Sequence, residues 1–366
     1  MKMIPQIEPW LDEREMDQLM EVVESTWLIE GEKAELFEKK FAALAQCRHA
    51  IVVCNATAGL YCCLKALGVG RDHEVIIPDL TFIATANAVI WAGAKPVLVD
   101  IDEESFNIDP RGIEEKITDR TRAIMPVHLY GQSADMEAIK DIAERHDLLV
   151  IEDAAQGVGA KFQGRHVGGW GDAGCFSFYG NKTITTGQGG MITTDNDEIR
   201  RKCLILKNHG RTQRGTFVHQ HIGYNFCFTD LQAALGLAQL AKLNQILSSK
   251  RRNDRLYRDL LSDVSGLRFP SDDARCLRAP WFTNILVDDP GALSQHLEAA
   301  GIATRRFFHP LHLQPCYRGR WTEQFPRAER IYQQGLSLPS SATLKEEQVS
   351  YICQQIKKFF GMVESQ

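Results

Sequence analysis

Several signatures that mark whole classes of protein are missing from this 366-residue sequence. No uninterrupted apolar run approaches the length of a membrane span, and the N-terminal stretch MKMIPQIEPWLDERE has no apolar signal core. Basic residues form no block and the formal net charge is −5, so nucleic acid and anionic membranes are poor candidate partners. The first expected strand is followed by no G-x-G-x-x-G motif, which counts against a nicotinamide dehydrogenase. We therefore expect a cytoplasmic globular protein.

The ten cysteines also lack the C-x-x-C spacing of zinc and redox sites. Several lie inside apolar runs, as Cys62 and Cys63 do. Free, buried thiols in a reducing compartment explain this pattern better than disulfides or zinc, so we expect no metal site.

What the sequence does contain is an alternation of short apolar strands with helices. Strands are expected at residues 50–54, 74–78, 96–100, 123–127 and 148–153, with helices at residues 55–67, 81–91 and 137–145 between them. Strands that are apolar throughout are typical of a mostly parallel sheet covered by helices on both faces. The pattern predicts an α/β fold whose ligands collect beyond the carboxyl ends of the strands, where Asn55, Asp79 and Asp153 fall.

The chain changes character after about residue 230. Helices are expected at residues 231–247 and 251–261, followed by a strand at residues 284–287 and helices at residues 290–300 and 345–360. We predict a large domain of residues 1–245, which includes helices between residues 12 and 44. A smaller α+β domain is predicted for residues 246–366.

Asp153 and Lys182 are the two side chains with the clearest chemical potential. Asp153 ends an apolar strand, where a half-buried carboxylate needs a cation or a hydrogen-bonded partner. The alternative for Asp153 is a helix N-cap for the segment that follows it. Lys182 comes after a strand-like segment, and desolvation there can lower its pKa and free its amine to attack a carbonyl. Taken alone, a solvated loop lysine explains the same position better.

Asn55, Ala56 and Thr57 open a helix directly after a strand. Backbone N–H groups at a helix start, with the hydroxyl of Thr57, form a ready phosphate site, although an ordinary Asn or Thr cap explains the same residues. A strand-end acid, a later lysine after a serine-containing strand and a phosphate-ready helix start are together what pyridoxal phosphate (PLP) requires. The acid keeps the pyridine nitrogen protonated, the lysine forms an imine with the aldehyde, and the helix start holds the phosphate.

Longer segments resemble one family, in order along nearly the whole chain. They are IIPDLTFIATANAVIWAGAKPVLVDID (76–102), PVHLYGQSADM (126–136), EDAAQGVGA (152–160), GGWGDAGCFSFYGNKTITTGQGGMITT (168–194) and GYNFCFTDLQAALGLAQL (223–240). These segments are similar to the sugar-nucleotide aminotransferases grouped as the DegT/DnrJ/EryC1/StrS family. Within the family, VHLYGQ, GNKTITTG and FFHPLHLQP (307–315) are most similar to the enzymes that aminate C4 of GDP-4-keto-6-deoxymannose.

The resemblance implies a PLP-dependent aminotransferase of fold type I, with a mostly parallel seven-stranded sheet in its large domain and a small α+β C-terminal domain. It implies pyridoxal 5′-phosphate as the cofactor, pyridoxamine phosphate as its amino form, and L-glutamate and a nucleotide sugar as the substrates. It also implies a homodimer with shared active sites. The expected product is an amino sugar for O-antigen or another surface polysaccharide.

The resemblance also assigns roles to single residues. Lys182 is the catalytic amine that bonds to the cofactor, and Asp153 is the partner of the pyridine nitrogen. The other expected cofactor-binding residues are Gln156 beside the ring 3-hydroxyl, Phe82 stacked on the ring, Ala56, Thr57 and Ser177 on the phosphate, and Asn225, which reaches the phosphate held by the other subunit. We expect His309 and Trp27 on the sugar side, and for Trp27 a place in the hydrophobic core is an equal alternative.

Two positions depart from the family pattern. Ala56 replaces a glycine at the helix start, which preserves the backbone donors provided that the position needs no positive φ. Cys227 replaces an arginine that is a candidate for binding a substrate anion.

The sequence leaves the nucleotide open among GDP, dTDP and UDP, and the ketone open between C3 and C4. Three alternative functions compete with transamination. Related dehydratases carry histidine in place of the lysine, whereas this chain has Lys182. A non-catalytic PLP-binding regulator on the same fold and a nucleotide-binding module without PLP are the more distant alternatives.

Overall fold

A seven-stranded sheet forms the centre of the molecule in the computed structural model, which describes residues 3–213, 215 and 217–362. The strand order is β1-β9-β8-β5-β4-β2-β3. The strands are β1 (His49–Val53), β2 (Glu74–Pro78), β3 (Lys95–Val99), β4 (Thr121–Ile124), β5 (Leu149–Asp153), β8 (Ala173–Ser177) and β9 (Gly190–Thr194). β9 runs antiparallel to both β1 and β8, whereas the other neighbouring strands are parallel. The predicted α/β fold with a mostly parallel seven-stranded sheet is confirmed.

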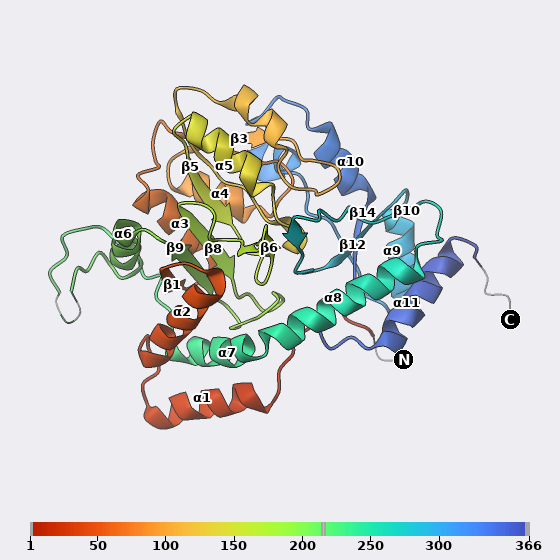
Figure 1. The fold of residues 1–366 in the computed structure, drawn as a ribbon, viewed down its shortest axis with the longest axis horizontal. Coiled ribbons are helices and arrows are strands. Elements are labelled where there is room, and N and C mark those ends of the chain that lie inside the picture. Colours follow the sequence, from red (N-terminus) through yellow and green to blue (C-terminus); the bar gives the residue numbers. More distant parts are fainter. Residues whose placement is uncertain (1–2, 214, 216, 363–366) are drawn as a thin grey trace.

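Helices cover both faces of this sheet (Figure 1). They are α2 (Glu32–Ala45), α3 (Ala56–Ala66), α4 (Ala84–Trp91), α5 (Met136–Arg145) and α6 (Asp197–Lys207). Alternate residues of β1 show how one strand serves two layers. Ile51 and Val53 are buried in the core that contains Leu60 of α3, whereas Val52 is buried in the core that contains Phe37 of α2. Because side chains alternate along a strand, a strand between two such cores is apolar throughout, as the sequence indicated.

The structure contains two smaller sheets, and most of their strands come from the C-terminal part of the chain. A four-stranded antiparallel sheet has the order β10-β12-β14-β13, and a small sheet has the order β11-β6-β7. Their strands are β6 (Lys161–Phe162), β7 (Arg165–His166), β10 (Leu267–Arg268), β11 (Cys276–Leu277), β12 (Thr283–Val287), β13 (Arg305–Arg306) and β14 (Gly335–Leu338). The remaining helices are α1 (Glu13–Ser25), α7 (Asp230–Ala241), α8 (Leu243–Leu260), α9 (Pro290–Ala299), α10 (Pro326–Gln334) and α11 (Glu346–Phe359). Short 3-10 turns occupy Pro110–Gly112, Glu114–Lys116, Leu129–Gly131, Leu311–Leu313 and Pro315–Tyr317.

The predicted break between two C-terminal helices is in the wrong place. The chain leaves helical geometry at Lys242, whose buried amine donates to Glu15 Oε2 at 2.8 Å, and α8 then continues without interruption through residues 248–250. Residues 248–250 are polar, yet the helix continues through them. The side chain of Lys250 is buried, and its amine donates to the backbone carbonyls of Trp281 and Ser340. The predicted domain boundary after residue 245 falls inside α8, and the division into two domains stays a prediction.

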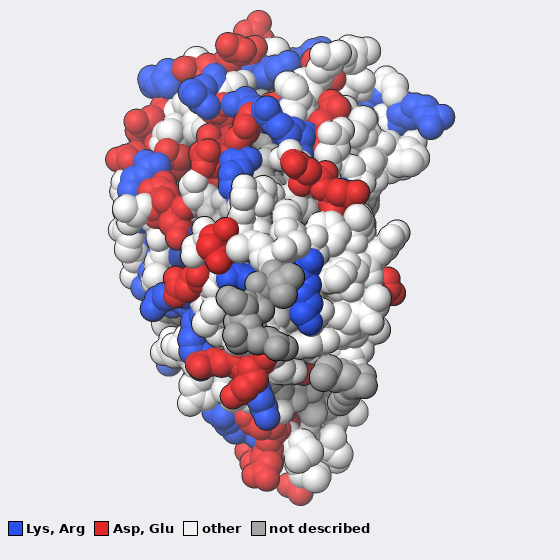
Figure 2. Space-filling view, turned by 90° about the vertical axis from the view of Figure 1, so that its right-hand side faces the viewer, with Lys and Arg blue, Asp and Glu red and all other residues white. Residues whose placement is uncertain are grey.

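The cysteines and the surface bear on the environment of the protein. All ten cysteines are free, and five of them are buried. Among the described residues, no helix has both the length and the apolar character needed to cross a bilayer. Figure 2 shows one end of the molecule, where basic and acidic side chains are interspersed over part of the described surface and uncharged residues cover much of the remainder. Such a face exerts no strong field of one sign on a ligand.

Gly190 joins β9 to the start of α3, and its replacement tests that contact. A Cβ at Gly190 would lie 2.8 Å from the backbone nitrogen of Ala56 and 2.7 Å from the carbonyl carbon of Asn55. We expect Gly190→Ala to lower the free energy of unfolding by about 1–3 kcal/mol, because backbone atoms cannot yield as a flexible side chain does. Chemical denaturation of the purified protein measures the change. Gly291→Ala, near the start of α9, is the control, since its Cβ would meet only a side-chain oxygen of Asp289 at 3.3 Å. Equal stability of the two variants would contradict the prediction.

Candidate active site

The carboxyl edge of the sheet gathers the polar residues that the sequence singled out. Asp153 ends β5, Ser177 ends the neighbouring strand β8, and Asn55 follows β1 within two residues. β1 and β8 both run antiparallel to β9, so they point the same way and their carboxyl ends share one edge. The residues therefore meet although they are far apart in the chain.

Asp153 is a buried carboxylate, and no cationic side chain of the described residues is bonded to it. Its side chain is 5% exposed; Oδ2 accepts a hydrogen bond from the Thr85 hydroxyl at 2.7 Å, and Oδ1 accepts one from the Ala155 N–H at 3.1 Å. Burial raises the pKa of Asp153 above its usual value, although these two hydrogen bonds oppose the rise. A cationic N–H placed against Asp153 would offset the burial, as a protonated pyridine does. No helix follows Asp153, so the N-cap alternative is wrong.

Lys182 lies in the loop after β8 with its amine against an aromatic ring. Lys182 Nζ is 3.7 Å from the centre of the Trp281 ring. Burial lowers the pKa of Lys182 to about 7; the charge of Asp153 opposes this shift, and that of Arg305 adds to it. A large share of the amine is therefore neutral near pH 7, which a nucleophile requires. Because the amine packs on Trp281, the alternative of a solvated loop lysine is wrong.

The start of α3 offers donors for an anion. Asn55 is the N-cap, and its Oδ1 accepts from the Ala58 N–H at 2.9 Å, so the first backbone N–H groups of the helix remain available. Ala56 is helical and is not among the residues with positive φ, which meets the condition set for replacing the glycine. Gly190 lies against the Ala56 nitrogen and pairs with Ser177 across the sheet. These contacts bring the Ser177 hydroxyl to the helix start, and the donor set fits a phosphate.

Gln156 and Phe82 lie on two sides of the same cluster. Gln156 Oε1 accepts from the Tyr130 N–H at 2.8 Å, which fixes the amide and leaves its NH₂ group as a donor. Phe82 is 49% exposed, and its ring centre is 5.6 Å from that of Phe308. Phe308 in turn stacks on Tyr130 at 5.5 Å with ring planes 5° apart. The Phe82 carbonyl accepts from the Thr85 hydroxyl, which also donates to Asp153, and an exposed ring at this position suits stacking on a planar cofactor.

Sequence reasoning missed four residues of this cluster: Thr85, Tyr130, Trp281 and Phe308. Thr85 and Tyr130 lie within segments that carry the family resemblance, and the polar Thr85 four residues after Thr81 was a usable signal. Trp281 comes from a segment about a hundred residues beyond Lys182, and no local pattern links the two.

Other predicted residues are placed less decisively. Asn225 is exposed and bridges to Asn208 through the backbone, so its expected contact with another subunit stays a prediction. His309 Nε2 lies 3.1 Å from the Leu313 carbonyl oxygen. Trp27 is 55% exposed, so the alternative that it is a core aromatic is wrong. The sugar-side roles of His309 and Trp27 stay predictions.

Asp79 lies at the predicted edge of the sheet but is already engaged. It follows β2, is fully buried, and its Oδ2 lies 2.7 Å from His312 Nδ1. The backbone N–H of His312 also donates to Asp79 Oδ1 at 2.9 Å. Asp79 therefore fastens the loop that carries Phe82 to the turn Leu311–Leu313, close to His309.

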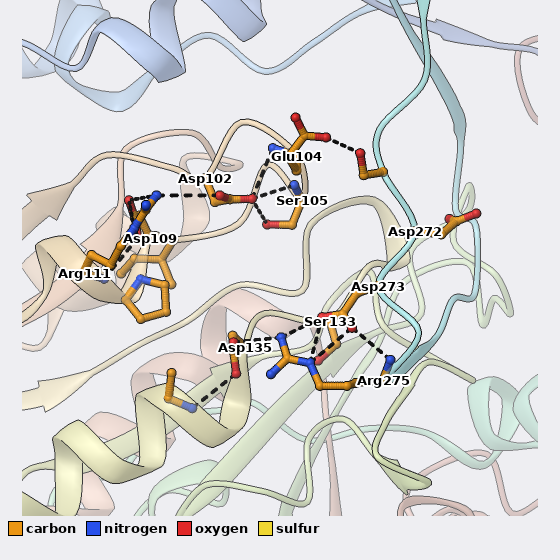
Figure 3. Close-up of a pocket in the computed structure, with 14 residues that line it drawn as sticks. Asp102, Glu104, Ser105, Asp109, Arg111, Ser133, Asp135, Asp272, Asp273 and Arg275 are labelled. Carbon is orange, nitrogen blue, oxygen red and sulfur yellow. Dashed lines mark hydrogen bonds and ion pairs between the residues drawn. The ribbon is translucent and has the colours of Figure 1, made fainter.

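A separate cavity of about 450 Å³ is lined by carboxylates, and Figure 3 shows how they are paired. Asp135 and Asp273 both bind Arg275, Asp109 binds Arg111, and Asp102 accepts from the Ser105 hydroxyl. The cavity shares no lining residue with the Lys182 cluster. Its ion pairs join loops of the large sheet to residues 271–275, and they explain the acidic side chains without a ligand.

Known proteins resemble this chain over almost its entire length. Residues 9–357 match the DegT/DnrJ/EryC1/StrS aminotransferase family. The chain belongs to this family. It is 39% identical to a GDP-perosamine synthase of Escherichia coli O157:H7 over 365 residues, which cover 99% of this chain and 100% of the relative. It is 40% identical to a GDP-perosamine synthase of Caulobacter vibrioides, with 94% and 95% of the two chains covered.

The structure has the same relatives. It superposes on DesV of S. venezuelae with a TM-score of 0.93 at 32% identity, covering 98% of this chain and 100% of DesV. The protein is a PLP-dependent sugar aminotransferase of fold type I. The charge on Asp153, the neutral share of Lys182 and the donors at α3 all fit that cofactor.

Asp153→Asn is expected to lower kcat by at least about 100-fold, which is the lower end of typical contributions from a positioned proton-transfer group. An amide of the same shape cannot favour a protonated pyridine nitrogen as a carboxylate does. Steady-state kinetics with saturating PLP measures the loss.

Thr85→Val is the matched variant, because it removes one hydrogen bond to Asp153 and leaves the charge in place. We expect its loss to be about tenfold, in line with a hydrogen bond to a charged group. An Asp153→Asn enzyme that binds PLP and retains full turnover would remove the role given to Asp153.

Proposed function

We propose that this enzyme transfers an amino group from L-glutamate to C4 of GDP-4-keto-6-deoxymannose and so forms GDP-perosamine. The observation that carries the proposal is the pairing of an amine whose pKa is about 7, on Lys182, with the buried carboxylate Asp153 at one sheet edge. The substrate is supported by the names of the relatives and by the segments VHLYGQ, GNKTITTG and FFHPLHLQP. We further propose that the amino sugar serves O-antigen or another surface polysaccharide.

The residues of this chain then divide the work as follows. PLP supplies an aldehyde that bonds to a primary amine and a protonated ring that accepts electrons. Asp153 holds the ring proton, and the NH₂ group of Gln156 donates to the 3-hydroxyl. Lys182 Nζ anchors the cofactor and moves the proton at the reacting carbon, for which a pKa near the working pH is favourable.

The remaining contacts bind and orient. Phe82 covers one face of the ring, and its exposure leaves that face free to receive it. The backbone N–H groups at Ala56 and Thr57 and the hydroxyl of Ser177 bind the phosphate. His309 and Trp27 contact the sugar nucleotide.

A panel of substrates tests the proposal. We expect GDP-4-keto-6-deoxymannose with L-glutamate to have a kcat/KM at least about tenfold above those of dTDP- and UDP-linked 4-keto-6-deoxysugars, since a few pocket contacts set such ratios. Mass spectrometry detects the amino product, and NMR identifies the aminated carbon. A higher kcat/KM for another nucleotide, or an amine at C3, would replace the proposed substrate. Lys182→Ala is the control and should form no product.

We also propose a homodimer in which each active site uses residues of both chains. The support is an apolar face that this chain leaves open. Met16, Met20 and Val23 lie on one side of α1, each more than half exposed, and the exposed Trp27, Leu28 and Ile29 follow. α1 lies at the outside of the molecule, packed on α7 (Figure 1). An apolar stripe on an outer helix is typical of an interface.

The ten free cysteines favour the reducing cytoplasm as the location of the protein.

Size-exclusion chromatography with light scattering should therefore report twice the mass of the chain. Met16→Glu with Met20→Glu should yield a monomer with little activity, because charge at the interface opposes burial and Asn225 can no longer reach the other site. Leu277→Glu introduces a negative charge at an exposed apolar residue on β11 and should change neither property. A monomeric double variant with full activity would contradict the shared sites.

A further inference from the structure

Trp281 makes two contacts that converge on Lys182. Its ring centre lies 3.7 Å from Lys182 Nζ, and its indole N–H donates to the carbonyl oxygen of Asn181, the residue before Lys182, at 2.6 Å. The indole therefore holds both the end of the lysine side chain and the backbone from which that side chain starts. Trp281 is 3% exposed and Lys182 is half-buried, so the contacts are largely shielded from water.

The position of the indole is itself fixed from three sides. The backbone N–H of Trp281 donates to the Tyr130 carbonyl at 3.1 Å, and the backbone carbonyl of Trp281 accepts from Lys250 Nζ at 3.2 Å. The indole also stacks on Phe282 with ring centres 4.1 Å apart. Tyr130 is bonded to Gln156, which follows β5 of the large sheet, and Lys250 belongs to α8. The large sheet and α8 therefore both help to fix the position of the indole.

We propose that Trp281 is a positioning residue that receives the charged amine of Lys182 whenever that amine is not bonded to the cofactor. An ammonium over an indole face gains about 1–2 kcal/mol when both are removed from water. A carboxylate at the same place would hold the proton far more strongly and would keep the amine from acting as a base. The indole thus keeps the amine within reach and partly protonated, without an ion pair that must be broken.

This role explains an arrangement that the remainder of the site leaves open. The charge of Asp153 acts on Lys182, yet the hydrogen bonds of Asp153 go to Thr85 and Ala155, and among the described residues no ion pair joins it to Lys182. Asp153 can therefore serve the ring nitrogen while the amine rests on Trp281. The inference rests on Lys182 being the reactive amine, which the colour test below examines separately.

The test is the titration of Lys182 in enzyme loaded with pyridoxamine phosphate, which leaves the lysine amine free. Trace acylation with an isotope-coded anhydride between about pH 5 and pH 10, read by mass spectrometry, reports the pKa of each lysine. We expect Trp281→Leu to lower the pKa of Lys182 by about one unit, because burial continues while the ring is lost. Trp281→Phe keeps an aromatic face and should stay near the wild-type pKa. A pKa in Trp281→Leu that is unchanged or raised would overturn the proposal.

Trp321→Leu is the matched control, since its indole N–H also donates to a backbone carbonyl, that of Pro96 at 3.3 Å, with no amine on the ring. It should leave the titration of Lys182 unchanged.

Should Trp281→Leu fail to fold, fluorinated tryptophan supplies a second measurement with nearly unchanged shape. Fluorine weakens the negative ring face, so the pKa of Lys182 should fall in the labelled wild type and not in labelled Trp281→Phe. No fall in the labelled wild type would overturn the role of Trp281. Loss of the PLP absorption band in Lys182→Ala tests the identity of the amine independently, so failure of the two assignments can be told apart.

Discussion

The burial of two opposite charges at one edge of a parallel sheet is the constraint on which the site depends. Asp153 is placed there by an apolar strand and Lys182 by the loop after its neighbour β8. Burial raises the pKa of the acid and lowers that of the amine, so each is pushed toward its neutral form. A fold that keeps them apart from each other can give each a separate partner. Thr85 partly satisfies the acid, and the face of Trp281 partly satisfies the amine.

The arrangement of the strands brings the start of α3 next to the end of β8. β9 is antiparallel between β1 and β8, so the helix start at Ala56 and the strand end at Ser177 lie on either side of Gly190. Glycine is needed there because a Cβ would meet the backbone of Asn55 and Ala56. Gly190 therefore keeps the start of α3 close to the end of β8, the neighbour of the strand that ends in Asp153.

The sequence was sufficient for the sheet and for the residues within local motifs. Asp153 and the start of α3 follow from strands and caps, which depend on neighbours in the chain. Lys182 needed a family resemblance, because the ring on which its amine packs, that of Trp281, lies far along the chain. The helix break at Lys242 was missed for the same reason: its partner Glu15 lies more than two hundred residues away. Asp79 was recognised at the edge, but its occupation by His312 depends on a contact between distant segments.

At position 227 this site lacks the positive charge of the arginine that the family pattern has there. Cys227 Sγ lies 3.5 Å from the Lys207 carbonyl oxygen, and burial raises the pKa of its thiol, so it carries no charge near pH 7. Arg305 of β13 lies 5.5 Å from the centre of the Phe308 ring, and its charge acts on both Lys182 and Tyr130. This guanidinium is carried by the C-terminal sheet, which β13 joins by pairing with β14. Because β12 of that sheet begins two residues after Trp281, the positions of the Arg305 guanidinium and of the Lys182 amine depend on the same packing between the two sheets.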